Sequence, residues 1–231
     1  RMGKMPKFEL AVKPSPESWR MWQKFLPAAL AAFGMQLNLI VDLILASLLP
    51  VGAISWLYYA DRVVQLPLGI VGIALGTALL PRFSQAEAAA NNASVKTALD
   101  GAIIFAGFLV IPAAIGLIIL AEPILKGLFA HGAFTNRDAG MAGFALIAYA
   151  IGIPGFVLVK ILQPAFYAAG RPGTVLKISA TMVAANIAGS LLLMGPFGHV
   201  GLAIATALSG LLAAAIMVIL LAAAGKFSRA I

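Results

Sequence analysis

Asp61 and Arg62 are adjacent in a run from Leu57 to Pro81 that contains no other charged residue. The run is long enough to form a membrane-spanning helix, because about 20 residues cross the roughly 30 Å of hydrocarbon in a bilayer. A charged side chain at the centre of such a helix costs about 3 kcal/mol or more, so charged residues there face a bundle interior or a water-filled cavity. The pair therefore indicates a path for a polar substrate.

The chemistry of Arg62 favours an anionic ligand. Its planar guanidinium carries five donors and can hold a phosphate or pyrophosphate through two hydrogen bonds at once. Asp61 points about 100° away around the helix, and Lys160, in a later apolar run, either lines the cavity or extends toward the inner membrane surface. We predict that Arg62, Asp61 and Lys160 bind substrate. The alternative is that Arg62 only forms a salt bridge with Asp42.

Three further polar residues are expected near Arg62. Counted from the nearest turn at 1.5 Å per residue, Asp42 and Arg62 each lie about 12 Å below the outer surface. Asn186 and Thr206 come to a similar depth on the last two predicted helices. Asp42, Asn186 and Thr206 offer oxygen ligands for Na⁺, and Asp42 alone can carry a proton; we predict them as an ion-coupling group. In the alternative, Asp42 neutralises Arg62 while the other two only hydrogen-bond between helices.

No catalytic residue is predicted, and neither is a cofactor or a metal site beyond the possible Na⁺ site. Cysteine is absent and the two histidines, His131 and His199, are isolated in sequence, which argues against thiolate or imidazole metal clusters. No phosphate-binding loop or nucleophile motif is found. The net charge of +8 lies largely in segments between apolar runs, a pattern of membrane topology that excludes nucleic-acid binding. The chain is not expected to be an enzyme.

Composition predicts an all-α, polytopic membrane helix bundle. Hydrophobic residues make up 62% of the 231 residues and charged residues only 10%, with a mean hydropathy of +1.01, whereas soluble chains are about 25% charged. Spanning segments must satisfy all backbone polar groups internally, which favours helices here. Six are predicted, at 25–49, 55–80, 101–121, 140–168, 175–195 and 200–223.

The distribution of Lys and Arg predicts the orientation. These residues concentrate in 1–24, 81–99, 170–177 and 224–231, whereas the opposite connections contain only Lys126 and Arg137. By the positive-inside rule, both ends of the chain are expected in the cytoplasm. The predicted organisation is a basic linker or amphipathic segment at 1–24, a transmembrane lobe at 25–223 and a cytoplasmic tail at 224–231.

Two motifs carry a resemblance to a known family. They are Tyr58-Tyr59-Ala60-Asp61-Arg62 with the downstream Gln65-Leu66-Pro67-Leu68-Gly69, and Pro164-Ala165-Phe166-Tyr167-Ala168 followed by Arg171-Pro172-Gly173-Thr174. The chain resembles the MurJ (MviN) family of lipid II flippases, within the superfamily of multidrug and polysaccharide exporters. The resemblance implies one lobe of a MATE-like two-lobe transporter, the second of its two six-helix lobes. The first lobe and two terminal helices would then be missing from a truncated sequence.

The resemblance also implies a function in peptidoglycan biosynthesis and cell shape. The substrate would be lipid II, an undecaprenyl-pyrophosphate-linked disaccharide peptide, moved across the bacterial inner membrane by alternating access, with membrane lipids as further partners. Arg62 matches a cavity arginine of the family, and Asp42, Asn186 and Thr206 fall at its Na⁺ site, with Ser190 where an acidic ligand is expected. Na⁺, H⁺ or the membrane potential would drive transport. The alternatives are another lipid-linked oligosaccharide exporter and a non-transporting scaffold of cell-wall synthesis.

Overall fold

A computed structural model describes residues 22–23, 25–26, 29–30, 39–89 and 92–225. Within these residues the secondary structure is helical and contains no strand. Five helices are long and apolar enough to cross a membrane, which confirms the all-α membrane bundle. Of the first predicted span, 25–49, residues 27–28 and 31–38 lie outside the described residues, as do nearly all of the predicted linker at 1–24 and most of the tail at 224–231.

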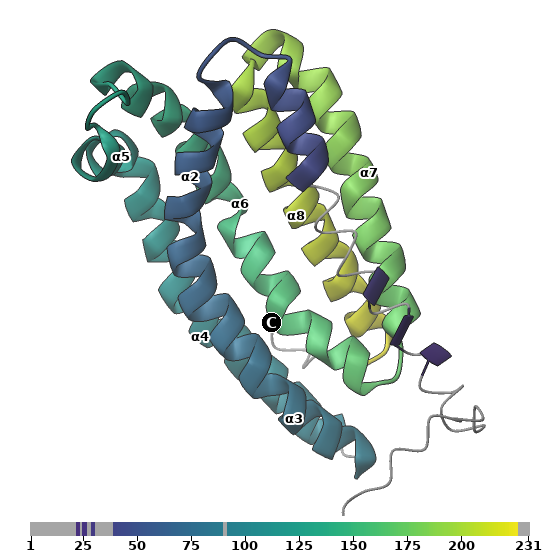
Figure 1. Cartoon of the computed structure of the whole chain (residues 1–231). Helices are drawn as coiled ribbons and strands as arrows, with labels where there is room; N and C mark the ends of the chain where they lie inside the picture. The colour runs from purple at the N-terminus through teal and green to yellow at the C-terminus, as the bar shows by residue number, and fades with distance from the viewer. Residues whose placement is uncertain (1–21, 24, 27–28, 31–38, 90–91, 226–231) are drawn as a thin grey trace, which may run out of the picture.

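The described helices follow one another with short connections (Figure 1). After the helical residues described between 22 and 30, a helical segment covers 39–47. The elements after it are α2 (Ala53–Pro67), the π-helix η1 (Leu68–Ile73), α3 (Ala74–Ala88), α4 (Asn92–Ile119), α5 (Ala121–Phe129), α6 (Asn136–Ala168), α7 (Pro172–Phe197) and α8 (His199–Ala223).

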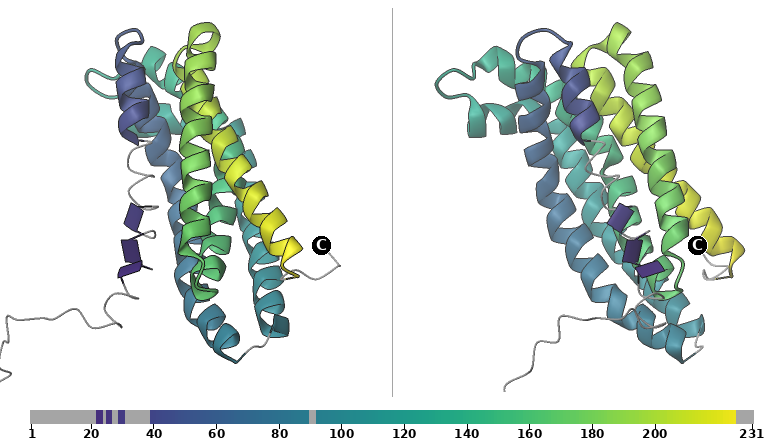
Figure 2. Two further views of the ribbon diagram at one scale, coloured as in Figure 1. Left: turned by 90° about the vertical axis from the view of Figure 1, so that its right-hand side faces the viewer. Right: turned by 45° about the vertical axis from the view of Figure 1, so that its right-hand side comes forward.

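The long helix α6 occupies the centre of the bundle. It packs against α8 on one side and against α2, η1, α3 and α4 on the other, while α7 packs mainly on α8. The continuous α2–η1–α3 helix and the α7–α8 pair therefore form two walls on either side of α6 (Figures 1 and 2). The helix α5 lies at one end, which we call the α5 end; the other is the Gly170 end.

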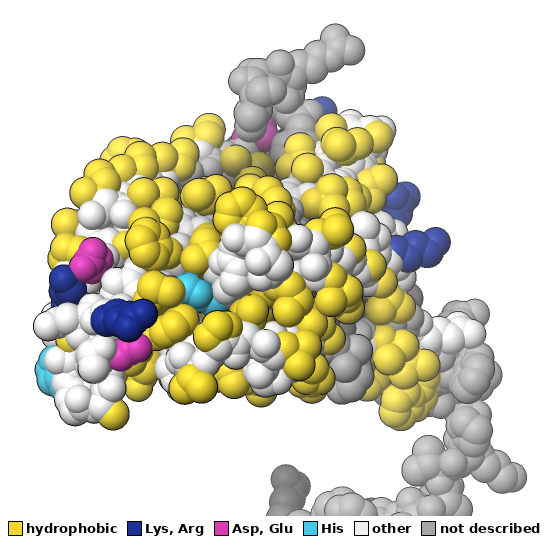
Figure 3. All heavy atoms as spheres, turned by 90° about the horizontal axis from the view of Figure 1, so that it is seen from above, with side chains coloured by type: hydrophobic (Ala, Val, Ile, Leu, Met, Phe, Trp, Pro, Cys, Tyr) yellow, Lys and Arg dark blue, Asp and Glu magenta, His cyan; other side chains and the backbone are white. Residues whose placement is uncertain are grey.

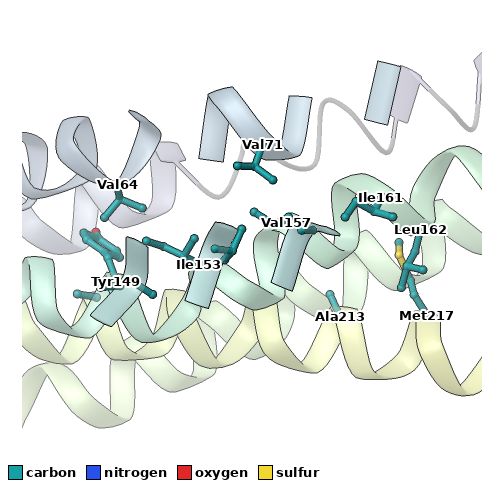
Figure 4. Packing of buried hydrophobic residues seen from close by; sticks show 14 of the residues in the cluster. Val64, Val71, Tyr149, Ile153, Val157, Ile161, Leu162, Ala213 and Met217 are labelled. Atoms are coloured by element: carbon teal, nitrogen blue, oxygen red, sulfur yellow. The ribbon is translucent and has the colours of Figure 1, made fainter. Parts of the chain in front are cut away.

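Small residues allow α6 and α8 to approach closely. A Cβ atom on Gly152 would lie 2.7 Å from the Cα of Ala207, and one on Gly155 would lie 2.9 Å from the backbone nitrogen of Leu211. Because lipid is as apolar as a helix surface, such close van der Waals packing is a main source of association between membrane helices. Figure 4 shows the surrounding core, with Val64 and Val71 of α2 and η1, Tyr149, Ile153, Val157 and Ile161 of α6, and Ala213 and Met217 of α8.

The π-helix begins directly after Pro67. Pro67 has no backbone N–H and cannot donate the usual hydrogen bond to the preceding turn. The N–H of Leu68 contacts the carbonyls of both Gln65 and Val64, and the helix then widens to π geometry over Leu68–Ile73. Such local widening within α-helices is frequent at functional sites.

The largest differences from the predicted helix ends lie in two connections. The expected 81–99 connection is mostly helical, because α3 continues through Pro81 to Ala88 and α4 begins at Asn92. The connection between the predicted spans 101–121 and 140–168 contains α5, and α6 begins at Asn136 rather than 140. Hydropathy detects where a helix leaves hydrocarbon, whereas helices continue past that point when backbone hydrogen bonds and capping allow.

Hydrogen bonds and ring contacts join three helices at the α5 end. Trp56 Nε1 donates to Asp138 at 2.9 Å, and Thr135 and Asp138 form a capping box at the start of α6. A ring nitrogen of His199, the first residue of α8, lies 2.9 Å from the carbonyl oxygen of Met141, and its ring packs on Trp56 at 4.8 Å. This end is viewed in Figure 3, where charged side chains lie at the side of α5 and the middle of the face is largely apolar.

Candidate functional site

A cavity of about 410 Å³ opens between α2–η1, α6, α7 and α8. Most of its lining is apolar, including Tyr149 and Phe156. Its polar side chains come from four helices, which cross at this level because α6 is central. They are Asp61 and Gln65 from α2, Lys160 and Gln163 from α6, Ser179 from α7 and Thr206 from α8.

Arg62 lies beside the cavity and is exposed rather than part of its wall. Its Nη1 donates to Oε1 of Gln65 at 3.3 Å, and its guanidinium carbon lies 4.6 Å from the centre of the Tyr58 ring. Gln65 in turn donates through Nε2 to the carboxylate of Asp61. Gln65 thus connects the exposed cation with the carboxylate in the cavity wall.

The predicted alternative, a salt bridge between Arg62 and Asp42, is not formed. Among the described residues, one ion pair has its nitrogen and oxygen within 4.0 Å of each other. It joins Lys126 and Glu122 at 2.6 Å. Arg62 instead rests on Tyr58 and Gln65 and keeps an exposed face. A guanidinium without a carboxylate partner retains the ability to bind an external anion.

Lys160 lines the cavity from α6, and two glycines make room for it. A Cβ atom on Gly72 would lie 2.9 Å from the Cδ of Lys160, and one on Gly76 would lie 2.7 Å from its carbonyl oxygen. The π-helix η1 and the start of α3 therefore pass directly over α6 at this residue. The stem of Lys160 thus packs against η1, and the residue lines the cavity.

Asp42, Asn186 and Thr206 meet at the α8 side of the cavity. Thr206 Oγ1 lies 3.2 Å from Oδ2 of Asp42 and accepts from Nδ2 of Asn186 at 2.9 Å. Asn186 and Ser190, one turn apart on α7, are completely buried, and Asn186 Oδ1 and Ser190 Oγ have no hydrogen-bond partner among the described residues. A buried polar atom without a partner costs about 1–3 kcal/mol.

This arrangement fits a monovalent cation better than a divalent metal. It brings carboxylate, amide and hydroxyl oxygens together with a single negative charge, which suits a hard, singly charged ion. No group of three or more His, Cys, Asp or Glu side chains that could hold a metal occurs in the described part of the chain. The residues that the sequence suggested for ion coupling are thus adjacent, although their role stays a prediction.

A family model described as lipid II flippase MurJ matches residues 4–231. The chain belongs to the MurJ family. This confirms the resemblance carried by the Tyr-Tyr-Ala-Asp-Arg motif, and it assigns the chain to a family of transporters.

Two curated members of the MurJ family illustrate the similarity. A probable lipid II flippase of Vibrio cholerae is 38% identical over 192 residues, which cover 83% of this chain and 37% of the relative. The lipid II flippase of Burkholderia cenocepacia is 36% identical over 183 residues, covering 79% of this chain and 36% of the relative. The chain therefore spans little more than a third of the length of these relatives.

Solved structures give the same picture of the fold. A MurJ lipid II flippase in an inward closed conformation superposes with a TM-score of 0.78 at 26% identity, covering 96% of this chain and 46% of that chain. An outward-facing MATE-family multidrug transporter superposes with a TM-score of 0.77 at 15% identity, covering 89% of this chain and 45% of that chain. The second similarity concerns the fold alone. The bundle corresponds to a little under half of each of these transporters.

Sequence reasoning missed three uncharged polar residues of the cavity: Gln65, Gln163 and Ser179. Gln65 lies one helical turn after Asp61, and Gln163 lies one turn after Lys160, so each shares a helix face with a charged residue of the cavity. That spacing was a usable signal. Ser179 carries no such signal, because its place in the wall depends on the packing of α7 against the rest of the bundle.

Proposed function

We propose that this chain forms one lobe of a lipid II flippase that moves the polar head group of its substrate across the membrane. The proposal rests on the MurJ family membership and on one observation: a cavity with Asp61 and Lys160 in its wall and Arg62 at its edge, within helices apolar enough to span a bilayer. A pyrophosphate in hydrocarbon would lose its hydration, and an isolated charge pays a very large desolvation cost there. The cationic groups of the cavity supply a counter-charge.

The transport cycle is alternating access, in which two lobes rock around a central cavity while the lipid tail stays in the bilayer. Arg62 holds the pyrophosphate through paired hydrogen bonds, Lys160 adds a second positive charge, and Asp61 and Gln65 keep the guanidinium in place. A carrier of drug cations would need an excess of acidic residues at this position. The cations at Arg62 and Lys160 support an anionic substrate instead.

Translocation of lipid II by the full gene product in liposomes tests the proposal. Fluorescent lipid II in the inner leaflet is expected to become accessible outside, whereas an undecaprenyl-linked O-antigen sugar is not. Transport of the second substrate alone would assign the protein to the other lipid-linked oligosaccharide exporters. Transport of neither, without binding of lipid II, would indicate a scaffold role in cell-wall synthesis.

The Gly170 end faces the cytoplasm of a bacterium and the α5 end faces outward across the inner membrane. The positive-inside rule supports this orientation, since Arg82, Lys96, Arg171 and Lys177 belong to the segments at the Gly170 end. In the naturally cysteine-free chain, a cysteine at exposed His131 should react with an impermeant maleimide on intact spheroplasts. One at exposed Lys177 should not. The reverse labelling would invert the topology.

Asp42, Asn186, Thr206 and Ser190 bind the ion that couples transport, and Na⁺ is the candidate that their oxygens fit. Na⁺ is therefore expected to raise the unfolding temperature of the purified full gene product relative to K⁺ at equal ionic strength. At ten times the dissociation constant the stabilisation is about 1.4 kcal/mol. Asp42→Asn and Thr206→Val should each abolish the Na⁺-dependent shift.

Thr181→Val is the matched control, because Thr181 is an exposed residue of α7 whose hydroxyl bonds only to its own helix at Lys177. That variant should keep the full Na⁺ response. A response of the wild type to pH, lost in Asp42→Asn, without any response to Na⁺ would assign the group to proton coupling. Equal behaviour of wild type and variants in both titrations would contradict an ion-coupling role.

A further inference from the structure

The short helix α5 divides into three lengthwise faces. Ala121 and Leu125 are buried against the bundle, with 2% and 0% of their surface exposed. Leu128 lies on one flank and is 56% exposed. Glu122 and Lys126 lie on the other flank, one turn apart, and form an ion pair at 2.6 Å. At 100° per residue, Leu128 and the Glu122–Lys126 pair are on opposite sides of the buried face.

Contacts with α2 and α6 fix the rotation of α5. The Phe129 ring lies 4.6 Å from the Tyr59 ring, and the ring of Phe134, just beyond the helix, lies 4.7 Å from the same Tyr59 ring. A Cβ atom on Gly143 of α6 would lie 3.5 Å from the Cα of Glu122, so the two helices are in close contact. The direction of the Leu128 flank is therefore set by the fold.

Exposed apolar residues also lie on α4, which leads into α5 through Leu120. Phe108, Ile115 and Ile119 of α4 are 76%, 51% and 71% exposed, and Leu120 in the turn between the helices is 49% exposed. Because α4 is one of the membrane-spanning candidates, its exposed apolar side faces lipid. Figure 3 shows charged side chains at the α5 end of the bundle, and Glu122 and Lys126 are both exposed. The exposed apolar flank of α5 thus suits hydrocarbon, and its exposed charged flank suits water.

We propose that α5 is an interfacial helix that binds the lipid bilayer, with Leu120 and Leu128 at the boundary between acyl chains and head groups and Glu122 and Lys126 among the head groups. An amphipathic helix at such a boundary buries its apolar side about 5–10 Å below the surface. The ring contacts continue from Phe129 through Tyr59 to Tyr58, on which the Arg62 guanidinium rests. These ring contacts connect α5 with the part of α2 that carries Arg62.

Spin labels on single cysteines test this proposal in the full gene product reconstituted into liposomes of pure phospholipid. Leu128→Cys and Lys126→Cys probe the two flanks of α5. Phe108→Cys is the hydrocarbon reference and His131→Cys is the water reference, and all four positions are exposed, so the labels leave the packing intact. Collisions with oxygen report lipid, and collisions with a water-soluble nickel complex report water.

The label at 128 is expected to collide with oxygen nearly as often as the label at 108 and to be protected from nickel. The label at 126 should match the water reference at 131. Equal nickel accessibility at 128 and 131 would overturn the proposal. Nickel access at 128 in pure lipid, combined with protection in native membranes, would also overturn it and would indicate a protein partner on this flank. Neither readout depends on transport activity.

Discussion

Replacing Arg62 with alanine is expected to abolish lipid II translocation and to weaken lipid II binding by about 10- to 100-fold. Hydrogen bonds to charged groups contribute about 1.5–3 kcal/mol each, and 1.4 kcal/mol corresponds to a tenfold change in affinity. The fold should be unaffected, because Arg62 is exposed and its described contacts are limited to Tyr58 and Gln65. Titration with lipid II and the liposome assay measure the two effects.

Arg62→Lys should lose only part of the activity, because the charge remains while the paired hydrogen bonds of the planar guanidinium are lost. Arg82→Ala is the control, since it removes the same charge from an exposed position on α3. The control should bind and transport as the wild type does. Normal lipid II translocation by Arg62→Ala would remove Arg62 from the substrate path.

Gly201→Ala is expected to destabilise the bundle severely. A Cβ atom at this position would lie 2.2 Å from the carbonyl oxygen of Leu193 and 3.0 Å from the backbone nitrogen of Met194. Both contacts are with backbone atoms, which cannot move aside as a flexible side chain can. The first turn of α8 would have to separate from the end of α7. Overpacking of this kind costs about 1–3 kcal/mol or more.

Thermal unfolding of the purified protein in detergent measures this effect. Gly195→Ala is the matched control, because Gly195 is an exposed residue of α7 with no atom near its Cβ position. In a helix, alanine is favoured over glycine by about 1 kcal/mol, so the control should be neutral or slightly stabilising. An equal unfolding temperature for the two variants would show that α8 adjusts without cost at this contact.

Hydropathy along the chain predicted the five spans found in the described residues, but not the ends of the helices. The runs around Arg62 and Lys160 were recognised as crossings, because hydrocarbon requires long apolar segments with internally paired backbone. The helical extension to Ala88 and the nine residues of α5 were missed. The first lies in a charged segment and the second is too short to cross a membrane, so neither has a spanning signal.

The full set of residues that line the cavity depends on how the helices pack against one another. Depth along each helix predicted that Asp42, Asn186 and Thr206 would share a level, and they meet within hydrogen-bond distance. Depth alone did not determine whether Arg62 and Lys160 face the cavity, because this also depends on the rotation of each helix about its axis. That rotation is set by close contacts, such as the contact of Gly76 in α3 with Lys160 in α6, and by the π-helix that follows Pro67.

The sequence by itself determined the membrane class, the helical fold and the family, because these follow from hydropathy and from a contiguous motif around Asp61 and Arg62. Only the tertiary structure decided that Arg62 rests on Tyr58 and Gln65 rather than on Asp42, and that Ser179 belongs to the cavity wall. The physical reason is that such contacts join helices far apart in the chain, and their geometry depends on how closely and at what rotation those helices pack.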